Sequence, residues 1–295
     1  MKILYGTHDI KIDVTDICLT KLIDSNGIIM IPETDHKRAE FFTDPFVGIH
    51  KKIFIENKEF DEYCSIRIDI KKSMVTSIFK NYENKLRSMQ SRLKLKFGSF
   101  QDEFPEQLMA TRFLKGEEKV LEIGGNIGRN SLIIASILNN QSNLVVLESD
   151  PNIANQLKEN REINNMSFHI ESSALSKRKL IQYGWDTIPS DIVHNGYKPV
   201  PIIDFQQLHA KYNIDFDTLV LDCEGAFFLI LIDMPEILKN INMIIMENDY
   251  KDIRHKQYID QILKNNKMKV IFSQEGGWGP CEKFFFEVWQ KQVHI

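Results

Sequence analysis

The sequence predicts an α/β protein in which a small all-β module and a connecting helix precede a mostly parallel sheet covered by helices. From residue 101 onward, short apolar runs alternate with helix-length segments, which is the pattern of a parallel sheet with helices on both faces. Before residue 73, short β-rich runs are separated by turn signals such as Ser25-Asn-Gly27. The expected divisions are 1–72, 73–100 and 101–295.

The first division contains four short β-rich runs, at 2–5, 28–31, 47–55 and 64–70. Several of them alternate apolar and polar residues, as Ile66-Arg-Ile-Asp-Ile70 does, which indicates strands with one face in water. A small antiparallel sheet or sandwich is expected. Such a module commonly binds a sugar or helps assembly. The alternative is an accessory domain that only packs on its neighbour, and the residues favour neither interpretation.

The segment 74–95 predicts a helix, because apolar residues from Met74 to Leu93 recur at steps of three and four. This helix would link the module to the large domain. If the chain forms a homo-oligomer, this helix or the N-terminal module is the expected contact surface. A further helix is expected over 103–114, leading into the first strand of the large sheet.

The large domain opens with an apolar strand followed by Glu122-Ile-Gly-Gly-Asn-Ile-Gly128 and a helix-length apolar run. Glycines let the backbone turn sharply and approach a ligand closely. A dinucleotide site requires G-x-G-x-x-G, and Asn126 stands where the second glycine should be. An acid two residues before the first glycine also suits a cationic ligand. We therefore expect S-adenosylmethionine rather than NAD, with Glu122, Gly124, Gly125, Asn126 and Gly128 around it.

A second expected strand, 144–147, ends in Glu148, whose carboxylate can accept both hydroxyls of a ribose. An acid at this distance from the glycines also occurs in NAD sites, so Glu148 alone does not discriminate. Ser149 follows it. Ser173 and Ala174 come after the expected third strand and are assigned to the adenine. A plain strand–turn–helix without a ligand is the alternative for the glycine loop taken alone.

Two more expected strands end in carboxylates, because Asp222 and Glu224 follow the run 217–221 and Glu247 follows 243–246. Strand ends in a parallel sheet share one rim, where ligands bind. Buried carboxylates are costly without a partner, and a cationic cofactor or polar substrate would supply one. For Asp249, a helix cap or a solvated position is the competing interpretation.

These motifs resemble the FkbM family of S-adenosylmethionine-dependent methyltransferases, over roughly two thirds of the chain. The matching segments are 120–128, 146–151, 157–160, 172–176, 221–226 and 245–247. The resemblance implies a Rossmann-like class I methyltransferase sheet and O-methylation, commonly of a sugar hydroxyl in a glycan or glycoconjugate. Phe227 stands where the family usually has another Glu, and Glu122 replaces an Asp.

Methyl transfer requires the acceptor oxygen in line with the S–CH3 bond and a base that removes its proton. Asp222, Glu224 and Glu247 are the candidate catalytic residues, with Glu224 or Glu247 as the base and His194 and His255 as outsiders. Asp222 is also expected at the cofactor, where it would orient the methionine end or the acceptor. Aromatic faces can stack on sugars, so the expected acceptor contacts are those of the loop 183–201 and of the turn 275–280: Trp185, His194, Tyr197 and Trp278. The histidines form no metal-binding spacing, and no metal is indicated.

Composition narrows the alternatives. A net charge of −4 argues against nonspecific nucleic-acid binding, which needs a basic surface. The four scattered cysteines fit a reducing compartment. Without a signal peptide or a long apolar run, a cytoplasmic location is expected, in the host cytoplasm if the source is viral. The remaining alternatives are an RNA or protein methyltransferase, an inactive glycan-binding or assembly protein, and an NAD oxidoreductase.

Overall fold

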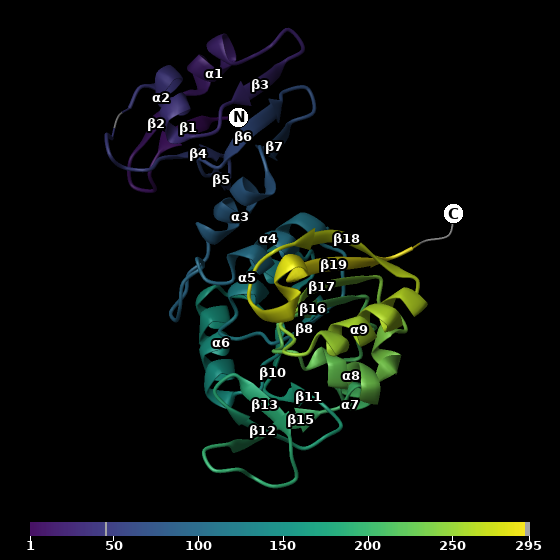
Figure 1. The fold of residues 1–295 in the computed structure, drawn as a ribbon. Helices are drawn as coiled ribbons and strands as arrows, with labels where there is room; N and C mark the ends of the chain where they lie inside the picture. Colours follow the sequence, from purple (N-terminus) through teal and green to yellow (C-terminus); the bar gives the residue numbers. More distant parts are fainter. Residues whose placement is uncertain (45, 293–295) are drawn as a thin grey trace. The chain divides into compact units, whose positions relative to one another are not determined.

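Figure 1 shows the fold in a computed structural model, which describes residues 1–44 and 46–292. The chain forms two compact units, Met1–Arg92 and Leu93–Ile295. The boundary between them falls inside the segment 73–100 that was expected to be a linker helix. That segment therefore contributes its first part to the N-terminal unit and its last part to the C-terminal one.

The N-terminal unit contains two antiparallel sheets. One has the order β2–β1–β4–β5, formed by Lys11–Asp13, Ile3–Gly6, Lys52–Ile55 and Lys58–Phe60. The other has the order β3–β6–β7, formed by Ile28–Ile31, Cys64–Asp69 and Met74–Phe79.

The prediction of an all-β module was wrong, because this unit also contains three helices. These are α1 (Thr15–Lys21), α2 (Asp35–Phe42) and α3 (Tyr82–Gln90). Cys18 of α1 and Phe42 of α2 are buried in the same apolar core as the strand residues. The Thr34 side chain accepts a hydrogen bond from the Lys37 backbone N–H and so caps α2. The two helices thus cover apolar sheet surface that strands alone would leave exposed.

The predicted helix over 74–95 was also wrong in its first part. Residues Met74–Phe79 form β7, which pairs with β6 and alternates between more and less exposed residues. The β-branched residues Val75, Thr76 and Ile78 favour a strand here. The helix begins only at Tyr82, where the Asn81 side chain accepts a hydrogen bond from the backbone N–H of Asn84.

The C-terminal unit is built on a seven-stranded sheet with the order β10–β9–β8–β16–β17–β19–β18. All neighbouring pairs are parallel except those that involve β19. The strands, in this order, are His169–Glu171, Leu144–Leu147, Val120–Ile123, Thr218–Leu221, Met243–Glu247, Phe286–Lys291 and Met268–Gln274. The strand order reverses between β8 and β16, and ligands of such sheets bind at that switch point.

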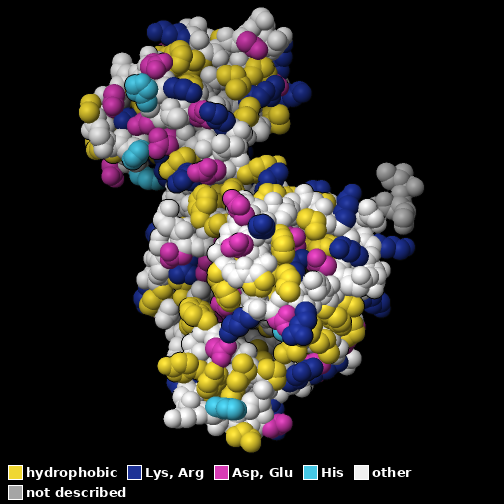
Figure 2. Space-filling view, viewed as in Figure 1, with side chains coloured by type: hydrophobic (Ala, Val, Ile, Leu, Met, Phe, Trp, Pro, Cys, Tyr) yellow, Lys and Arg dark blue, Asp and Glu magenta, His cyan; other side chains and the backbone are white. Residues whose placement is uncertain are grey.

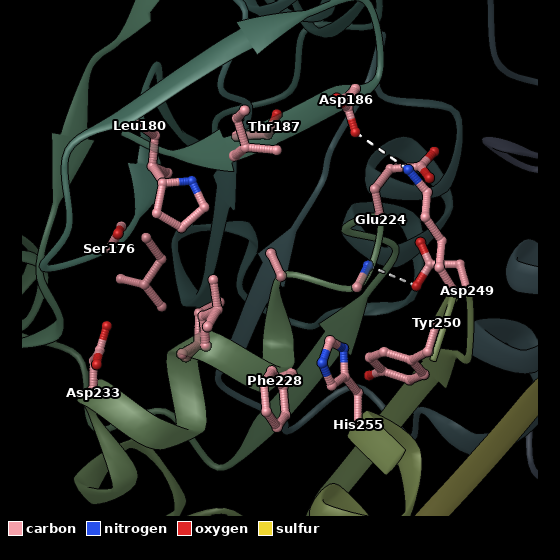
Figure 3. A pocket seen from close by; sticks show the side chains of 18 of the residues that line it. Ser176, Leu180, Asp186, Thr187, Glu224, Phe228, Asp233, Asp249, Tyr250 and His255 are labelled. Atoms are coloured by element: carbon pink, nitrogen blue, oxygen red, sulfur yellow. Dashed lines mark hydrogen bonds and ion pairs between the residues drawn. The ribbon is translucent and has the colours of Figure 1, made fainter. Parts of the chain in front are cut away.

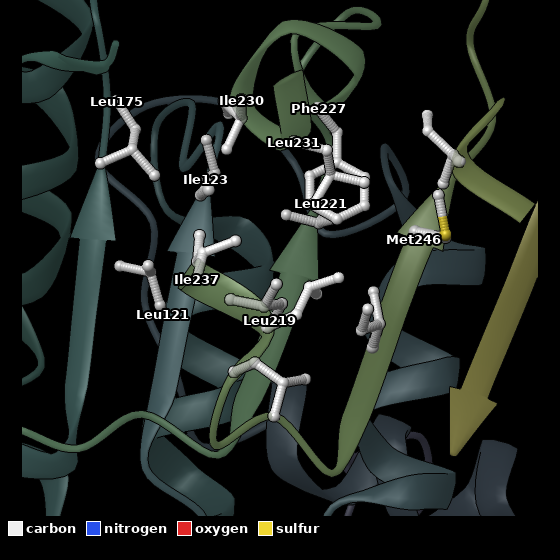
Figure 4. Close-up of a cluster of buried hydrophobic side chains, with 14 of the residues drawn as sticks. Leu121, Ile123, Leu175, Leu219, Leu221, Phe227, Ile230, Leu231, Ile237 and Met246 are labelled. Carbon is white, nitrogen blue, oxygen red and sulfur yellow. The ribbon is translucent and has the colours of Figure 1, made fainter. Parts of the chain in front are cut away.

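Helices cover both faces of this sheet. On one face, apolar residues of α4 (Phe104–Phe113), α5 (Arg129–Ile137) and α6 (Pro151–Ile163) pack on the strands. On the other face lie α7 (Phe205–Tyr212), α8 (Phe227–Asp233) and α9 (Ile253–Asn265). Figure 4 shows Phe227, Ile230 and Leu231 of α8 above Leu219 and Leu221 of β16. Because α8 begins directly after the β16 rim, this packing fixes the position of Asp222 and Glu224.

The segment 183–201, expected to be a long loop, includes strand residues at 183, 186–189 and 198–200. It contributes to a three-stranded antiparallel sheet, β13–β12–β14, formed by Asp186–Pro189, Leu180–Tyr183 and Lys198–Val200. The apolar residues Ile181 and Ile188 pair directly across this sheet. A short parallel pair is formed by β11 (Ala174–Leu175), which precedes this sheet in the chain, and β15 (Ile202–Ile203), which follows it.

The four cysteines are free thiols. No helix within the described residues has the length and apolar character needed to cross a membrane. On the face shown in Figure 2, Lys and Arg side chains are interspersed with Asp and Glu side chains. Such intermixed charge is typical of a solvated surface rather than of a nucleic-acid footprint.

Candidate active site

The glycine loop after β8 is held against two neighbouring strands. The backbone N–H groups of Gly124 and Gly125 both donate to the carbonyl of Leu147 at the end of β9, at 3.0 and 2.9 Å. Gly124 has a φ of 91°, and a Cβ at this position would lie 1.6 Å from the backbone oxygen of Asp222. Only glycine fits here, because both the backbone conformation and the space exclude a side chain.

Glu148 connects this loop to β9. Its buried carboxylate accepts hydrogen bonds from the backbone N–H groups of Asn126, at 2.9 Å, and Asp150, at 2.8 Å. Burial raises the pKa of Glu148, and these two hydrogen bonds oppose that effect. A carboxylate has about four lone-pair sites, so it can accept more than these two hydrogen bonds. Glu148 therefore holds the loop while it can still accept a hydroxyl.

Asn126 stands at the position where a dinucleotide-binding site would need glycine. Its φ is 46°, and its side-chain oxygen accepts the Ile127 backbone N–H at 2.8 Å. The side-chain amide donates to Glu103 Oε1 at 2.9 Å. Arg129 Nη1 contacts the same Glu103 oxygen at 2.6 Å. The loop is thus tied to the acidic start of α4.

A cavity of about 200 Å³ opens at the switch point of the sheet. The expected cofactor residues that line it are Gly124, Asn126, Glu148, Ser149, Ser173, Ala174 and Asp222. Glu122, Gly125 and Gly128 are not among its lining residues within the described chain. A Cβ on Gly125 would meet the Val146 side chain at 2.2 Å, and Gly128 is the residue that precedes α5. These two glycines shape the loop.

Glu122 lies in the protein interior. Its side chain is buried beside Asn130 and Ser131 of α5, and burial raises its pKa to about 8. Its Oε2 atom has no hydrogen-bond partner among the described residues. Burial therefore favours the neutral form of Glu122, which lies outside the described linings of both cavities, and its expected place beside a cationic ligand stays a prediction.

Other carboxylates concentrate around Asp222, which lines the smaller cavity. Burial raises the pKa of Asp222 well above its usual value, and the nearby carboxylates of Glu103, Glu106, Asp249 and Glu224 raise it further. Glu106 is itself buried, with a pKa of about 7. This arrangement favours a bound cation, because a positive charge would relieve the mutual repulsion.

A second cavity, of about 600 Å³, adjoins the first. The lining residues that the two cavities share are Leu175, Leu180, Trp185, Thr187, Glu224, Ala226 and Ile230. Figure 3 shows the larger cavity with Glu224, Asp249 and Asp186 along one side. A reacting atom held near the shared wall would be within reach of groups bound in either cavity.

Asp249 belongs to this site by position, although it was not among the expected site residues. It is buried and lines the larger cavity, and burial raises its pKa to about 7. Its Oδ1 atom accepts the Gly225 backbone N–H at 2.8 Å, whereas Oδ2 has no partner among the described residues. The signal that could have found it is its place two residues after β17, on the rim that also carries Asp222.

Of the four residues expected to contact the acceptor, the structure places one in the cavity lining. Trp185 lines both cavities, whereas His194, Tyr197 and Trp278 are not among the lining residues in the part of the chain that the structure describes. Tyr197 donates a hydrogen bond to Asp186 Oδ2 at 2.5 Å, so it supports a residue of the cavity wall. His194 Nε2 lies 3.2 Å from Ser190 Oγ, and Trp278 is half exposed.

Glu247 and His255 also differ from expectation. Glu247 ends β17, pairs in register with Phe286 of β19 and lies outside the described linings of both cavities. His255 lines the larger cavity and stacks on Phe228, with ring centroids 3.8 Å apart. Within residues 1–44 and 46–292, no group of three or more His, Cys, Asp or Glu side chains is arranged to hold a metal ion.

No family model and no curated protein matches the chain. Solved structures do resemble it. A ribosomal protein L11 methylase from Lactobacillus delbrueckii subsp. bulgaricus is 13% identical over 67% of this chain and 82% of its own, with a TM-score of 0.42. A putative O-methyltransferase from Klebsiella pneumoniae is 14% identical over 72% and 90%, with a TM-score of 0.39.

An O-methyltransferase from Bacillus cereus, solved in complex with SAH, is 14% identical over 70% of this chain and 89% of its own, with a TM-score of 0.40. All three TM-scores are below 0.5, so these resemblances support no conclusion about this chain. The strand order and the antiparallel β19 give the C-terminal unit a Rossmann-like class I methyltransferase fold. The chemistry of the site has to be argued from its own residues.

Proposed function

We propose that this chain binds S-adenosylmethionine in the smaller cavity and transfers its methyl group to a hydroxyl held in the larger one. The observation that carries the proposal is the concentration of carboxylates around Asp222, at the switch point of the sheet. S-adenosylmethionine carries a sulfonium and an ammonium group, which these carboxylates would stabilise. The pyrophosphate of a dinucleotide is an anion, and the same carboxylates would repel it.

The roles follow from position. Glu148 accepts the ribose hydroxyls, Ser173 and Ala174 flank the adenine, and Asp222 faces the methionine end. When bound, the cofactor supplies an activated methyl group, so the protein has to orient the acceptor oxygen and remove its proton. Glu224 lies on the wall that the two cavities share, and burial raises its pKa above the usual value of 4.5. We assign the base to Glu224 rather than to Glu247.

The acceptor type rests on different support. The resemblance of the sequence motifs to the FkbM family favours a sugar hydroxyl as the methyl acceptor. The residues that line the larger cavity are separate evidence on the type of acceptor. An RNA acceptor would need a basic approach surface, and the intermixed charges of Figure 2 do not favour one.

The test of the cofactor assignment is calorimetric titration of the whole protein with S-adenosylmethionine. Glu148→Ala should weaken binding at least about tenfold, since it removes the acceptor of two loop N–H groups and of the ribose. Glu275→Ala changes an exposed acid far along the chain and is the matched control. Equal affinities for both variants and the wild type would exclude the proposed cofactor site.

A further inference from the structure

The larger cavity is of a size and composition that suit a compact ligand. Its volume of about 600 Å³ falls in the usual range for drug-sized molecules. Aliphatic side chains form part of its walls and come from β12, β13, α8 and the residue that follows α8: Leu180, Ile188, Pro189, Leu229, Ile230 and Met234. Pockets of this kind hold apolar bodies, because contact with such walls removes apolar surface from water.

Aromatic rings form one end of this cavity. Phe228 and His255 stack with an interplanar angle of 10°, and Figure 3 shows them next to the buried Tyr250. Trp185 contributes a ring at the wall shared with the smaller cavity. Flat rings bind well against such surfaces, since aromatic pairs gain energy beyond the area they bury.

Nine lining residues carry polar side chains, and several of these already have partners. Asp233 accepts two hydrogen bonds from Arg178, at 2.6 and 2.8 Å. Asp186 interacts with Lys251 at 3.2 Å and accepts the Tyr197 hydroxyl. Asp249 differs, because it is buried and its Oδ2 atom has no partner within the described residues. Among the four carboxylates of the lining, Asp249 and the neighbouring Glu224 therefore keep the most accepting capacity.

A sugar does not match this distribution. A hexose carries hydroxyls around its whole ring, and each one buried without a partner costs about 1–3 kcal/mol. The aliphatic walls would leave several of them unpaired. A molecule with an apolar body and one terminal hydroxyl would pair that hydroxyl at the acidic side and place the rest against carbon.

We propose that the larger cavity takes an acceptor with a flat, mainly apolar body and a single hydroxyl directed at Glu224 and Asp249, and that it discriminates against polyhydroxylated sugars. This inference rests on the proposed function only in making that hydroxyl the methyl acceptor. Binding of such a molecule can be measured without methyl transfer.

The experiment compares two probes, naphthol and methyl glucoside, by calorimetry on the full chain. Naphthol has two fused rings and one hydroxyl, whereas the glucoside has a comparable size and several hydroxyls. We expect naphthol to bind at least about tenfold more tightly, a difference of about 1.4 kcal/mol. Binding of the glucoside with equal or higher affinity would overturn the proposal.

Variants on α8 locate the binding. Leu229→Asp puts a charge on the cavity wall and should weaken naphthol binding at least about tenfold, while Leu229→Met keeps the wall apolar and should preserve it. Ile232→Asp is the matched control, because Ile232 is an exposed residue of the same helix and is not among the described lining residues. Equal naphthol binding by all three variants would place the ligand elsewhere and overturn the inference.

Each variant is also titrated with S-adenosylmethionine, which separates the two proposals. Retained cofactor affinity in Leu229→Asp would show that the variant is folded and that only the acceptor cavity has changed. Failure of the wild type to discriminate between the probes, with intact cofactor binding, would sink the acceptor inference alone. Failure of the wild type to bind the cofactor would sink the proposed function, whatever the probes do.

Discussion

The Gly225 backbone N–H donates a 2.8 Å hydrogen bond to Asp249 Oδ1, which ties the loop after β16 to the segment after β17. Glu224 and Gly225 both have positive φ angles, of 50° and 78°. A non-glycine residue in this region is strained, so the surrounding structure must hold it there. The bond to Asp249 provides such support directly beside the proposed base.

Asp249→Ala should lower the free energy of unfolding by about 1–3 kcal/mol, because it leaves the buried Gly225 N–H without its acceptor. Asp249→Asn keeps an oxygen in place and should cost less than half as much. Urea denaturation of both variants measures the difference. If alanine and asparagine were equally mild, the hydrogen bond would have no part in holding the Glu224 loop.

Gly124→Ala should destabilise the protein by more than about 3 kcal/mol and abolish cofactor binding. The new Cβ would have to occupy the space of the Asp222 carbonyl, so the loop or β16 must move. Gly184→Ala is the matched control, since Gly184 also has a positive φ but no atom within 4 Å of the added Cβ. Its cost should be about 1–2 kcal/mol, from the backbone conformation alone. Thermal unfolding measures the loss of stability in both variants. An equal loss would contradict the close approach of Gly124 to the Asp222 carbonyl.

Glu122 should make stability depend on pH. Its pKa rises from the usual 4.5 to about 8 on folding, so the folded state binds the proton more tightly. The stabilisation is full below pH 4.5 and is lost as the pH rises toward 8. Glu122→Gln cannot ionise, so its stability relative to the wild type should increase over that range by up to about 1.4 kcal/mol per pH unit.

Thermal unfolding at several pH values measures this relative stability. Glu106 and Asp249 also have raised pKa values, but they are present in both proteins and their effects cancel in the comparison. Asp191→Asn, at an exposed position, is the control and should show no trend. A difference between Glu122→Gln and the wild type that stays constant with pH would mean that Glu122 is ionised in the folded protein.

Glu224→Gln should lower turnover by about 10²–10⁴-fold, which is the usual contribution of a positioned base. Cofactor affinity should stay within about twofold, because the amide keeps the size of the side chain on the cavity wall. Glu247→Gln should leave turnover nearly unchanged, since Glu247 lies outside the described cavity linings. Rates with the first accepted substrate decide between the two. Normal turnover by Glu224→Gln would move the base elsewhere.

The sequence predicted the large sheet well because its strands are buried on both faces. Continuous apolar runs such as Val120–Ile123 and Thr218–Leu221 are typical of strands buried in a parallel sheet. The acids that follow them mark the rim of that sheet. The run 74–79 was misread because short apolar spacings fit a strand and a helix equally well. Its pairing with β6, a tertiary contact, decided the outcome.

The site was predictable only where the chain itself forms the motif. Gly124, Asn126 and Asp222 lie in local turns whose residue types carry the signal. The role of Asp249 depends on a neighbouring loop, and the placing of Trp185 depends on the β12–β13 hairpin. Periodicity in one chain does not reveal such pairings. The raised pKa of Glu122 likewise follows from burial, which the sequence shows only indirectly.

The central claim is that the carboxylates at the switch point of the sheet select a cationic cofactor. Parallel calorimetric titrations with S-adenosylmethionine and NADH test it most directly. We expect saturable binding of S-adenosylmethionine at least about a hundredfold tighter than that of NADH, a difference of about 2.8 kcal/mol. Equal or tighter binding of NADH, or no binding of either molecule, would contradict the account.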